Sequence, residues 1–133
     1  PILCPVAYVD NIPMLDGGIC DAIPIGRAME LGYKKNVVVV TRHKGFRKHS
    51  NEVKLLSFLY RKYPAMREAL NNRNTAYNER MELIEKLEEE GVIHVIRPQK
   101  TVTVDRIEKD VNKLIALHEE GYECGKQVTS MKL

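Results

Sequence analysis

The spacing of apolar and polar residues along the chain predicts a mixed α/β fold. Residues 12–15 and 37–40 are short apolar runs of strand length, and the four valines of the second run suit a strand buried on both faces of a parallel sheet. Residues 24–31 between them have helical spacing, with Pro24 suited to the first turn and Gly32 to the stop. This order predicts a βαβ unit with a right-handed crossover.

A long helical pattern then covers residues 52–90. Because proline breaks a helix interior, Pro64 is expected to divide this pattern into two helices. The second helix is expected to be interrupted near residues 71–74, which include three asparagines, and to end in a solvated acidic run at residues 88–90. The second half of the chain is therefore predicted to be mostly helical.

One more strand and one more helix follow. Residues 92–96 are apolar and are followed by an Arg-Pro pair, as expected for a strand. The last helix is predicted to begin at either Asp105 or Asp110, since Asp105 and Glu108 have the spacing of a capping box, and to stop at Gly121. The pattern contains no internal repeat and no linker that separates independent domains.

Length and composition fit a globular protein with a hydrophobic core. The 133 residues are 44% hydrophobic and 29% charged, which argues against a disordered chain. No apolar run has the length of a membrane helix and no signal-peptide pattern is present, so a cytoplasmic location is expected. The three cysteines form no CxxC pair and are expected to be reduced thiols. Because the chain begins at Pro1 without methionine, we expect it to be a piece of a longer protein.

The net charge of +3 is mild, and the positive excess lies in one basic stretch. Arg42, Lys44, Arg47 and Lys48 are candidates for contact with a phosphate group, while a solvated loop after the valine strand is the simpler interpretation. Phe46 is the only aromatic residue inside the stretch, so nucleic-acid binding is not expected.

The segment of most chemical interest is Asp16-Gly17-Gly18, which joins a strand-like run to a helix-like one. In α/β proteins such a loop lies at the carboxyl edge of the sheet, where sites are usually found. The two glycines permit positive φ and close approach of another backbone, so the loop can hold a partly buried Asp16 carboxylate as a general base. The alternative is that Asp16 only forms the turn. Phosphate binding at this turn is disfavoured because the carboxylate would repel it.

Other catalytic arrangements are missing from the sequence. No serine lies in a G-x-S-x-G elbow, and the four histidines show no HExxH or similar metal-binding spacing. Cys20 has no histidine nearby in sequence and is expected to pack as a small buried hydrophobic residue. We therefore expect no metal and no other cofactor, and the group that Asp16 would serve is not evident.

An ordered series of motifs resembles the C-terminal part of bacterial patatin-like phospholipases. Asp16-Gly17-Gly18 alone would be weak evidence, but the series covers nearly the whole chain. It consists of residues 15–24, Gly32-Tyr33, residues 37–42, residues 44–48, residues 60–64, residues 96–98 and residues 109–122.

The resemblance implies an α/β acyl hydrolase with a three-layer parallel-sheet fold and a Ser-Asp dyad. In that family a G-x-S-x-G serine attacks the acyl ester, a glycine-rich loop binds the oxyanion, and the aspartate matched here by Asp16 acts as base. Residues 1–48 would be the C-terminal part of the catalytic domain, and residues 49–133 a mostly helical extension packed on it. The serine and the oxyanion loop would lie before Pro1, so this chain alone is expected to be inactive.

The resemblance also implies partners. These are a lipid or other acyl ester, the N-terminal part of the same protein and, in a homo-oligomer, a second copy, at a cytoplasmic location or at a membrane surface. Lipid headgroups would contact Arg42, Lys44, Arg47 and Lys48. The alternative from a different class is a non-catalytic protein-interaction module, in which residues 52–90 present a helical surface to a partner and Asp16 only shapes a turn.

Overall fold

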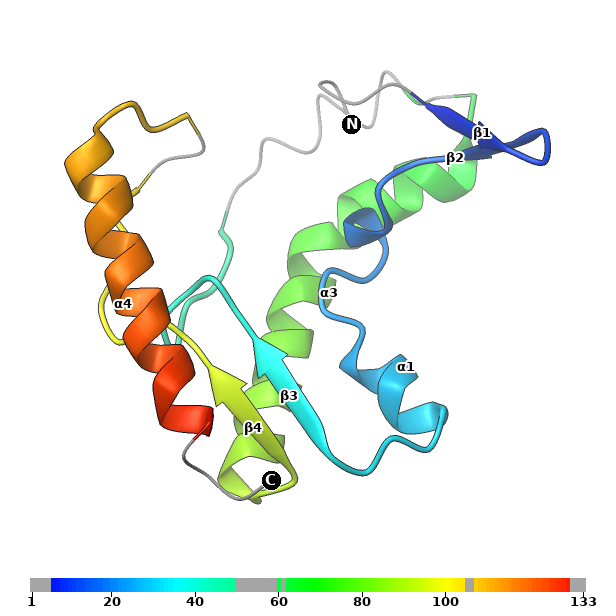
Figure 1. Ribbon diagram of the computed structural model, residues 1–133. Coiled ribbons are helices and arrows are strands. Elements are labelled where there is room, and N and C mark those ends of the chain that lie inside the picture. Colours follow the sequence, from blue (N-terminus) through cyan, green and yellow to red (C-terminus); the bar gives the residue numbers. More distant parts are fainter. Residues whose placement is uncertain (1–5, 50–59, 61, 105–106, 130–133) are drawn as a thin grey trace. The chain divides into compact units, whose positions relative to one another are not determined.

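The computed structural model describes residues 6–49, 60, 62–104 and 107–129 (Figure 1). The chain divides into two compact units, each built from two stretches of sequence. Unit 1 comprises Pro1–Pro24 and Arg47–Arg80, and unit 2 comprises Ile25–Phe46 and Met81–Leu133. Both units therefore combine residues from before and after residue 48, and the division into residues 1–48 and 49–133 stays a prediction.

Unit 1 begins with a β-hairpin. Strand β1 (Ala7–Val9) pairs antiparallel with β2 (Ile12–Met14), and Val9 lies opposite Ile12. The two residues of the turn, Asp10 and Asn11, have φ angles of 49° and 63°. Positive φ at both central residues is the requirement of a tight two-residue hairpin turn, and aspartate and asparagine tolerate it well. The residues of both strands are exposed.

This hairpin corrects the predicted βαβ unit. Residues 12–15 were expected to share a parallel sheet with residues 37–40, but β2 pairs with β1, and β3 (Asn36–Val39) pairs with β4 (Ile93–Ile96). The prediction was wrong because an apolar run does not specify its partner strand. The Asp-Asn turn, which joins residues 7–9 to residues 12–14, was the overlooked signal.

Helix α3 (Pro64–Glu89) contributes to both units. It begins at Pro64, as expected for a proline that is tolerated in a first turn. The expected interruption at residues 71–74 is wrong, since the helix is continuous over 26 residues. Leu70, Met81 and Ile84 are almost completely buried, so burial outweighs the low helix propensity of the asparagines. The helix predicted before Pro64 lies mostly outside the described residues.

Unit 2 contains a two-stranded parallel sheet, so the structure is mixed α/β. Strand β3 pairs with β4 in a register that places Val37 opposite His94. The chain between these strands includes α3, which makes the connection a β-α-β crossover. Both strand predictions, 37–40 and 92–96, are confirmed to within a residue. The valine run is not covered on both faces, because Val38 is buried whereas Val39 is 68% exposed.

Two further helices belong to unit 2. Helix α1 (Ile25–Glu30) ends as predicted near Gly32, whose φ of 87° suits only glycine well. Helix α4 (Val111–Thr129) follows Asp110, whose Oδ1 accepts a hydrogen bond from the Asn112 N–H at 3.0 Å. The predicted stop at Gly121 is wrong, because the helix passes through this glycine without positive φ. Asp105, the other predicted start, lies outside the described residues.

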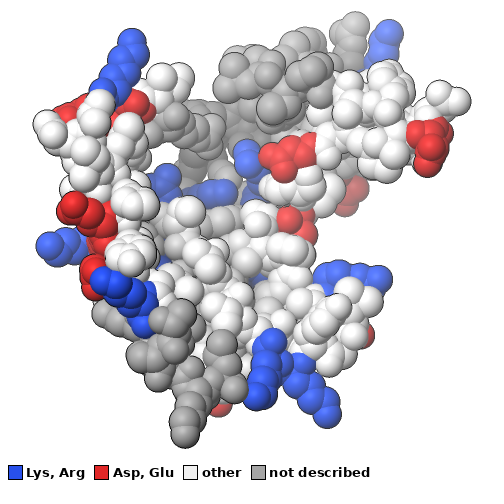
Figure 2. Space-filling view, in the orientation of Figure 1, with Lys and Arg blue, Asp and Glu red and all other residues white. Residues whose placement is uncertain are grey.

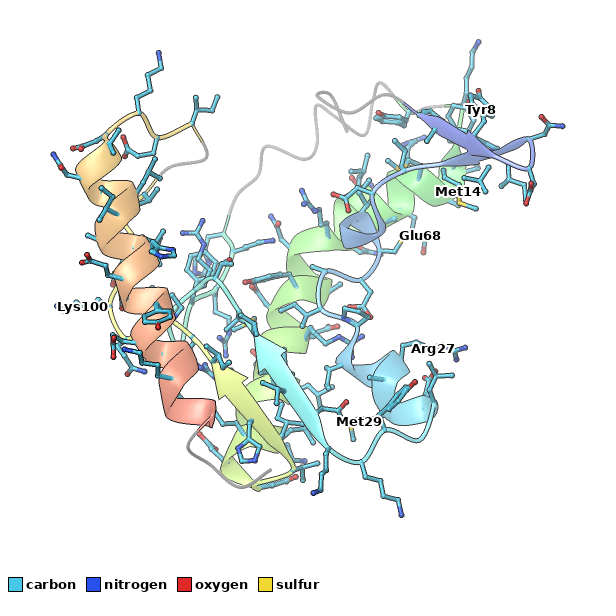
Figure 3. The ribbon with its side chains drawn as sticks, viewed as in Figure 1. Tyr8, Met14, Arg27, Met29, Glu68 and Lys100 are labelled. Carbon is cyan, nitrogen blue, oxygen red and sulfur yellow. The ribbon has the colours of Figure 1, made fainter. Side chains whose placement is uncertain are left out.

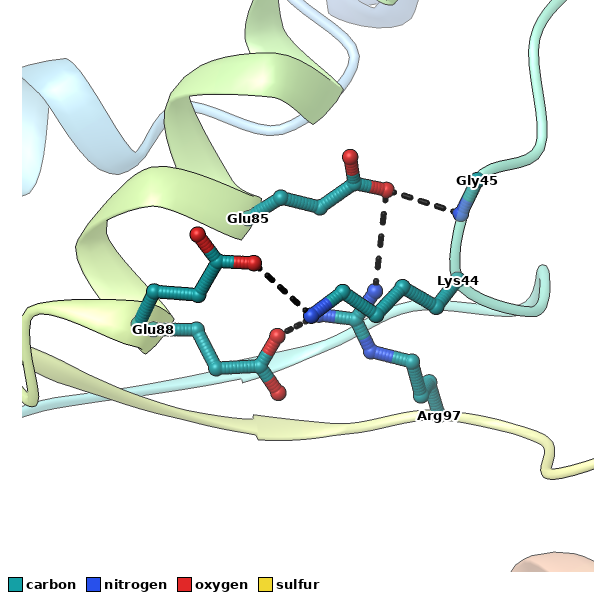
Figure 4. A network of polar contacts seen from close by, with 6 residues as sticks. Lys44, Gly45, Glu85, Glu88 and Arg97 are labelled. Carbon is teal, nitrogen blue, oxygen red and sulfur yellow. Dashed lines mark hydrogen bonds and ion pairs between the residues drawn. The ribbon is translucent and has the colours of Figure 1, made fainter.

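The end of α3 is held by a buried arginine. Arg97, which directly follows β4, is 7% exposed and forms ion pairs with Glu88 and, at 3.9 Å, with Glu85 (Figure 4). Its Nε and Nη1 atoms are buried without a hydrogen bond among the described residues. A guanidinium in such a position depends on its two carboxylate partners, because an unpaired buried charge is strongly unfavourable.

The loop after β3 contacts the same end of α3. The N–H of Gly45 donates to Glu85 Oε1 at 2.9 Å, and Lys44 pairs with Glu89 at 3.0 Å (Figure 4). The acidic run at residues 88–90 was expected to be a solvated helix end, and Glu89 and Glu90 are indeed exposed, whereas Glu88 is half-buried in its pair with Arg97. Arg97 and Lys44 are distant in sequence from this run, so helical spacing alone does not reveal these pairs.

Candidate active site

Asp16 lies at the start of a single turn of 3-10 helix, η1 (Gly17–Ile19). The residue has φ −54° and ψ 121°, and its carboxylate caps the turn: Oδ1 accepts a hydrogen bond from the Gly18 N–H at 2.9 Å. Aspartate is among the best capping residues because its carboxylate satisfies an N–H that the helix leaves free. One oxygen of the candidate base is thus held in place by its own loop.

The two glycines of the motif have different roles. Neither has positive φ, so the conformational freedom expected of them is not used. A Cβ at Gly18 would lie 3.2 Å from Asp16 Oδ1, whereas a Cβ at Gly17 would meet nothing within 4 Å. Position 18 is therefore the one where a side chain would press on the carboxylate.

A cavity of about 340 Å³ lies beside this turn, wholly within unit 1. Its volume is at the lower end of the range for small-molecule sites. The hairpin and the Asp16 turn form one wall, and the first turns of α3 with the preceding tyrosines form the other; Tyr8 marks the hairpin in Figure 3. The lining is mainly apolar, and it consists of Val6, Tyr8, Pro13, Leu15, Asp16, Gly17, Ile19, Cys20, Tyr60, Tyr63, Ala65, Met66 and Ala69.

Of the described residues in this lining, Asp16 is the acidic one. The residue is exposed, so the partial burial expected for it is not found. Its Oδ2 has no hydrogen bond to any described residue. Cys20 is also exposed, which corrects the expectation of a buried thiol. The buried residue of this turn is its neighbour Ile19, which is 4% exposed.

The segment after the turn is anchored to α3. Asp21 Oδ2 pairs with Arg80 at 3.2 Å, and Asp21 Oδ1 accepts the Ile23 N–H at 3.3 Å. Both side chains of the ion pair are about one-third exposed, which makes it stronger than a fully solvated pair. Of the two aspartates in this segment, Asp21 therefore pairs with a residue of another element, whereas Asp16 accepts a hydrogen bond from its own loop.

The four candidate headgroup residues are divided between the two units. Arg42 and Lys44 belong to unit 2, and Arg47 and Lys48 to unit 1. Each already has an intramolecular contact: Arg42 lies 5.0 Å from the Phe46 ring centre, Lys44 pairs with Glu89, and Arg47 also has a partner. Lys48 Nζ lies 3.6 Å from the centre of the Tyr77 ring.

The described part of the chain contains no cluster of three metal-ligating side chains. Among the helices that the structure describes, none is both long enough and apolar enough to cross a bilayer.

Comparison with known proteins identifies a family. The family model with the description Domain of unknown function (DUF6363) matches residues 63–130, which is more than half of the chain. The chain belongs to the DUF6363 family. Searches of curated proteins and of solved structures found no match.

The DUF6363 match covers α3, β4 and α4, whereas Asp16 precedes it. The matched region nevertheless supplies a wall of the cavity, through Tyr63, Ala65, Met66 and Ala69. The sequence did not indicate that these residues lie beside Asp16. The spacing of residues 65, 66 and 69 indicates one helix face, but only the fold shows that the face borders this turn.

Proposed function

We propose that the chain is the C-terminal part of a patatin-like serine acyl hydrolase, in which Asp16 is the general base. The observation that carries the proposal is the position of the Asp16 carboxylate, which is held through Oδ1 at the edge of an apolar cavity. The resemblance of the Asp-Gly-Gly turn and of the later motifs supplies the reaction class. The three-layer sheet of that family is part of the proposal.

The proposed chemistry follows from the acceptor that remains on Asp16. A serine hydroxyl from the preceding part of the polypeptide donates to Oδ2, and Asp16 takes its proton as the serine oxygen bonds to the acyl carbon. The proton then passes to the departing alcohol, which leaves an acyl-serine. Water, deprotonated in turn by Asp16, releases the carboxylic acid and restores the serine. Without that serine, the chain described here is inactive.

Exposed apolar side chains support the idea that further parts of the protein pack against this chain. In the hairpin, Tyr8 is 72% exposed, and Ile12 and Met14 are also exposed. In unit 2, Val37 and Val39 are exposed on a parallel sheet, a type of sheet that is almost always covered on both faces. Side chains without charge predominate over β3 and β4 in the view of Figure 2.

The proposal is tested with the longer polypeptide that contains the serine. Asp16→Asn keeps an oxygen that can accept from the Gly18 N–H, so it preserves the cap while removing the base. Hydrolysis of short and long acyl esters should fall about 10²- to 10⁴-fold. Asp10→Asn is the matched control, because it removes the same charge from an exposed turn where asparagine is well tolerated. Equal activity of the Asp16→Asn and wild-type proteins would refute the proposal.

A second candidate function is a non-catalytic protein-interaction module, and the observation that favours it lies in α4. Val111, Leu114, Ile115 and Tyr122 are exposed and share one face of this helix, as expected for a surface that binds another protein. This interaction module would be self-sufficient and monodisperse in size-exclusion chromatography. The hydrolase proposal predicts that the isolated chain oligomerises, because its sheets lack their cover.

The remaining partners belong to the same proposal. The substrate is a lipid or other acyl ester, the N-terminal part of the same polypeptide supplies the serine, and the protein acts in the cytoplasm or at a membrane surface. Headgroup contact by Arg42, Lys44, Arg47 and Lys48 is tested by vesicle flotation. A lack of preference for anionic over neutral lipids would exclude it.

A further inference from the structure

We infer that the cavity beside Asp16 binds the hydrocarbon chain of the substrate, and that Ala65 and Ala69 of the DUF6363 region set the chain length it accepts. This inference rests on the proposed function for one point only, which is that the bound hydrocarbon chain is part of an ester. The binding of a neutral hydrocarbon chain to the cavity is derived from the cavity itself.

The lining of the cavity selects a neutral, apolar ligand. Leu15, Ile19 and Met66 present hydrocarbon or thioether surface, and the side chains of Tyr8 and Tyr63 add aromatic surface. Burial of apolar ligand surface against such a lining is the main source of affinity in sites of this kind. Among the described residues that line the cavity none is basic, so they offer no counter-ion to a ligand with a buried negative charge.

Asp16 gives the ligand a direction. Its carboxylate is the charged group among the lining residues that the structure describes, and it belongs to the turn on one side of the cavity. A carboxylate repels an anion and tolerates an uncharged ester. The reacting end of the ligand therefore lies at Asp16, and the rest of the chain extends along α3. The free fatty acid produced by hydrolysis would be repelled, which favours its release.

The two alanines of α3 leave space for the hydrocarbon chain of the ligand. Ala65 and Ala69 are one helical turn apart, so their methyl groups lie on the same face and both line the cavity. A larger side chain at either position would occupy the space that the ligand needs. Ala65 is exposed and Ala69 is half-buried, so a larger residue at position 65 carries little risk for folding. These positions are determinants of specificity and take no part in the chemistry.

The experiment uses this chain by itself. The neutral fluorescent probe N-phenyl-1-naphthylamine is bound to the protein and displaced by straight-chain fatty-acid methyl esters of increasing length. Each methylene that enters the cavity should raise the affinity about fourfold until the cavity is full. Ala69→Phe and Ala65→Phe should end this increase at a shorter chain, with losses on the order of 50-fold for long esters and little change for the shortest.

Two controls separate the cavity from general effects. Ala116→Phe places the same side chain at an exposed helical alanine in α4, outside the cavity, and should leave all affinities unchanged. Asp16→Asn should strengthen the binding of free fatty acids, because it removes the charge that repels them. Unfolding by urea, followed by circular dichroism, verifies that each variant is folded.

The outcomes distinguish this inference from the proposed function. If the probe and the esters fail to bind the wild-type chain, or if Ala69→Phe and Ala65→Phe bind long esters as the wild type does, the inference is wrong. The hydrolysis test of Asp16→Asn is independent of that result. If length-dependent binding responds to both alanines but Asp16→Asn leaves hydrolysis unchanged, the cavity assignment stands and the proposed chemistry fails.

Discussion

Alanine substitution at the two glycines of the Asp16 turn should have different effects on stability. Neither glycine has positive φ, so alanine fits the backbone at both positions and should stabilise the protein by about 0.4–1 kcal/mol through the unfolded state. At Gly17 nothing lies within 4 Å of the added Cβ, and this gain should be observed in full.

At Gly18 the added Cβ would lie 3.2 Å from Asp16 Oδ1, which is too close by a few tenths of an ångström. The carboxylate must move, and its 2.9 Å hydrogen bond to the Gly18 N–H weakens or breaks. Loss of such a cap costs about 1 kcal/mol, which offsets the gain from alanine. We expect Gly18→Ala to be about 1 kcal/mol less stable than Gly17→Ala, and to lower activity in the longer polypeptide because the base is displaced.

Equilibrium unfolding in urea measures this difference, because the two variants change the same atoms one residue apart and should have equal m-values. If Gly17→Ala and Gly18→Ala have the same free energy of unfolding, the carboxylate is not held by the turn as described, and the reasoning fails.

Two further substitutions test other parts of the structure. Arg97→Met should lower the free energy of unfolding by about 3 kcal/mol, because Glu85 and Glu88 lose their buried partner. The control Arg27→Met should change it by less than about 0.5 kcal/mol, because the pair with Glu30 is two-thirds exposed. Similar losses for both variants would contradict the role of Arg97. The pKa of Glu108 is lowered, mainly by a hydrogen bond from the Asp110 N–H, so its carboxylate stabilises the fold above its ordinary pKa and this contribution is lost as the pH falls through the lowered value. The difference in free energy of unfolding between wild type and Glu108→Gln should therefore shrink between about pH 7 and about pH 3, and a constant difference would contradict this assignment.

Local signals in the sequence were enough to place several elements. The valine run, Pro64, Gly32 and Asp110 each act through the backbone of their own segment, by strand preference, a fixed φ, positive φ or capping. Such effects depend on a few neighbouring residues, so they are readable without the fold. Gly121 shows the limit of this reading, since glycine permits a helix stop without requiring one.

Long-range features could not be obtained in this way. The pairing of β2 with β1, the burial of Arg97 and the partners of the acidic end of α3 depend on contacts between distant segments. The candidate site likewise has a part that the sequence indicates and a part that only the fold shows. Asp16 and its glycines were found from their motif, whereas the cavity wall formed by Ala65 and Ala69 becomes visible only when α3 packs beside the turn.

The most direct test of the central claim is the rate at which an alkyl fluorophosphonate modifies the longer polypeptide. In this reaction a serine oxygen bonds to phosphorus as fluoride leaves, so the rate reports how strongly the serine is activated. If Asp16 is its base, Asp16→Asn should slow the modification at least about 100-fold, while Asp10→Asn leaves it unchanged. Equal rates for wild type and Asp16→Asn, or no modified serine in the folded wild-type protein, would contradict the account.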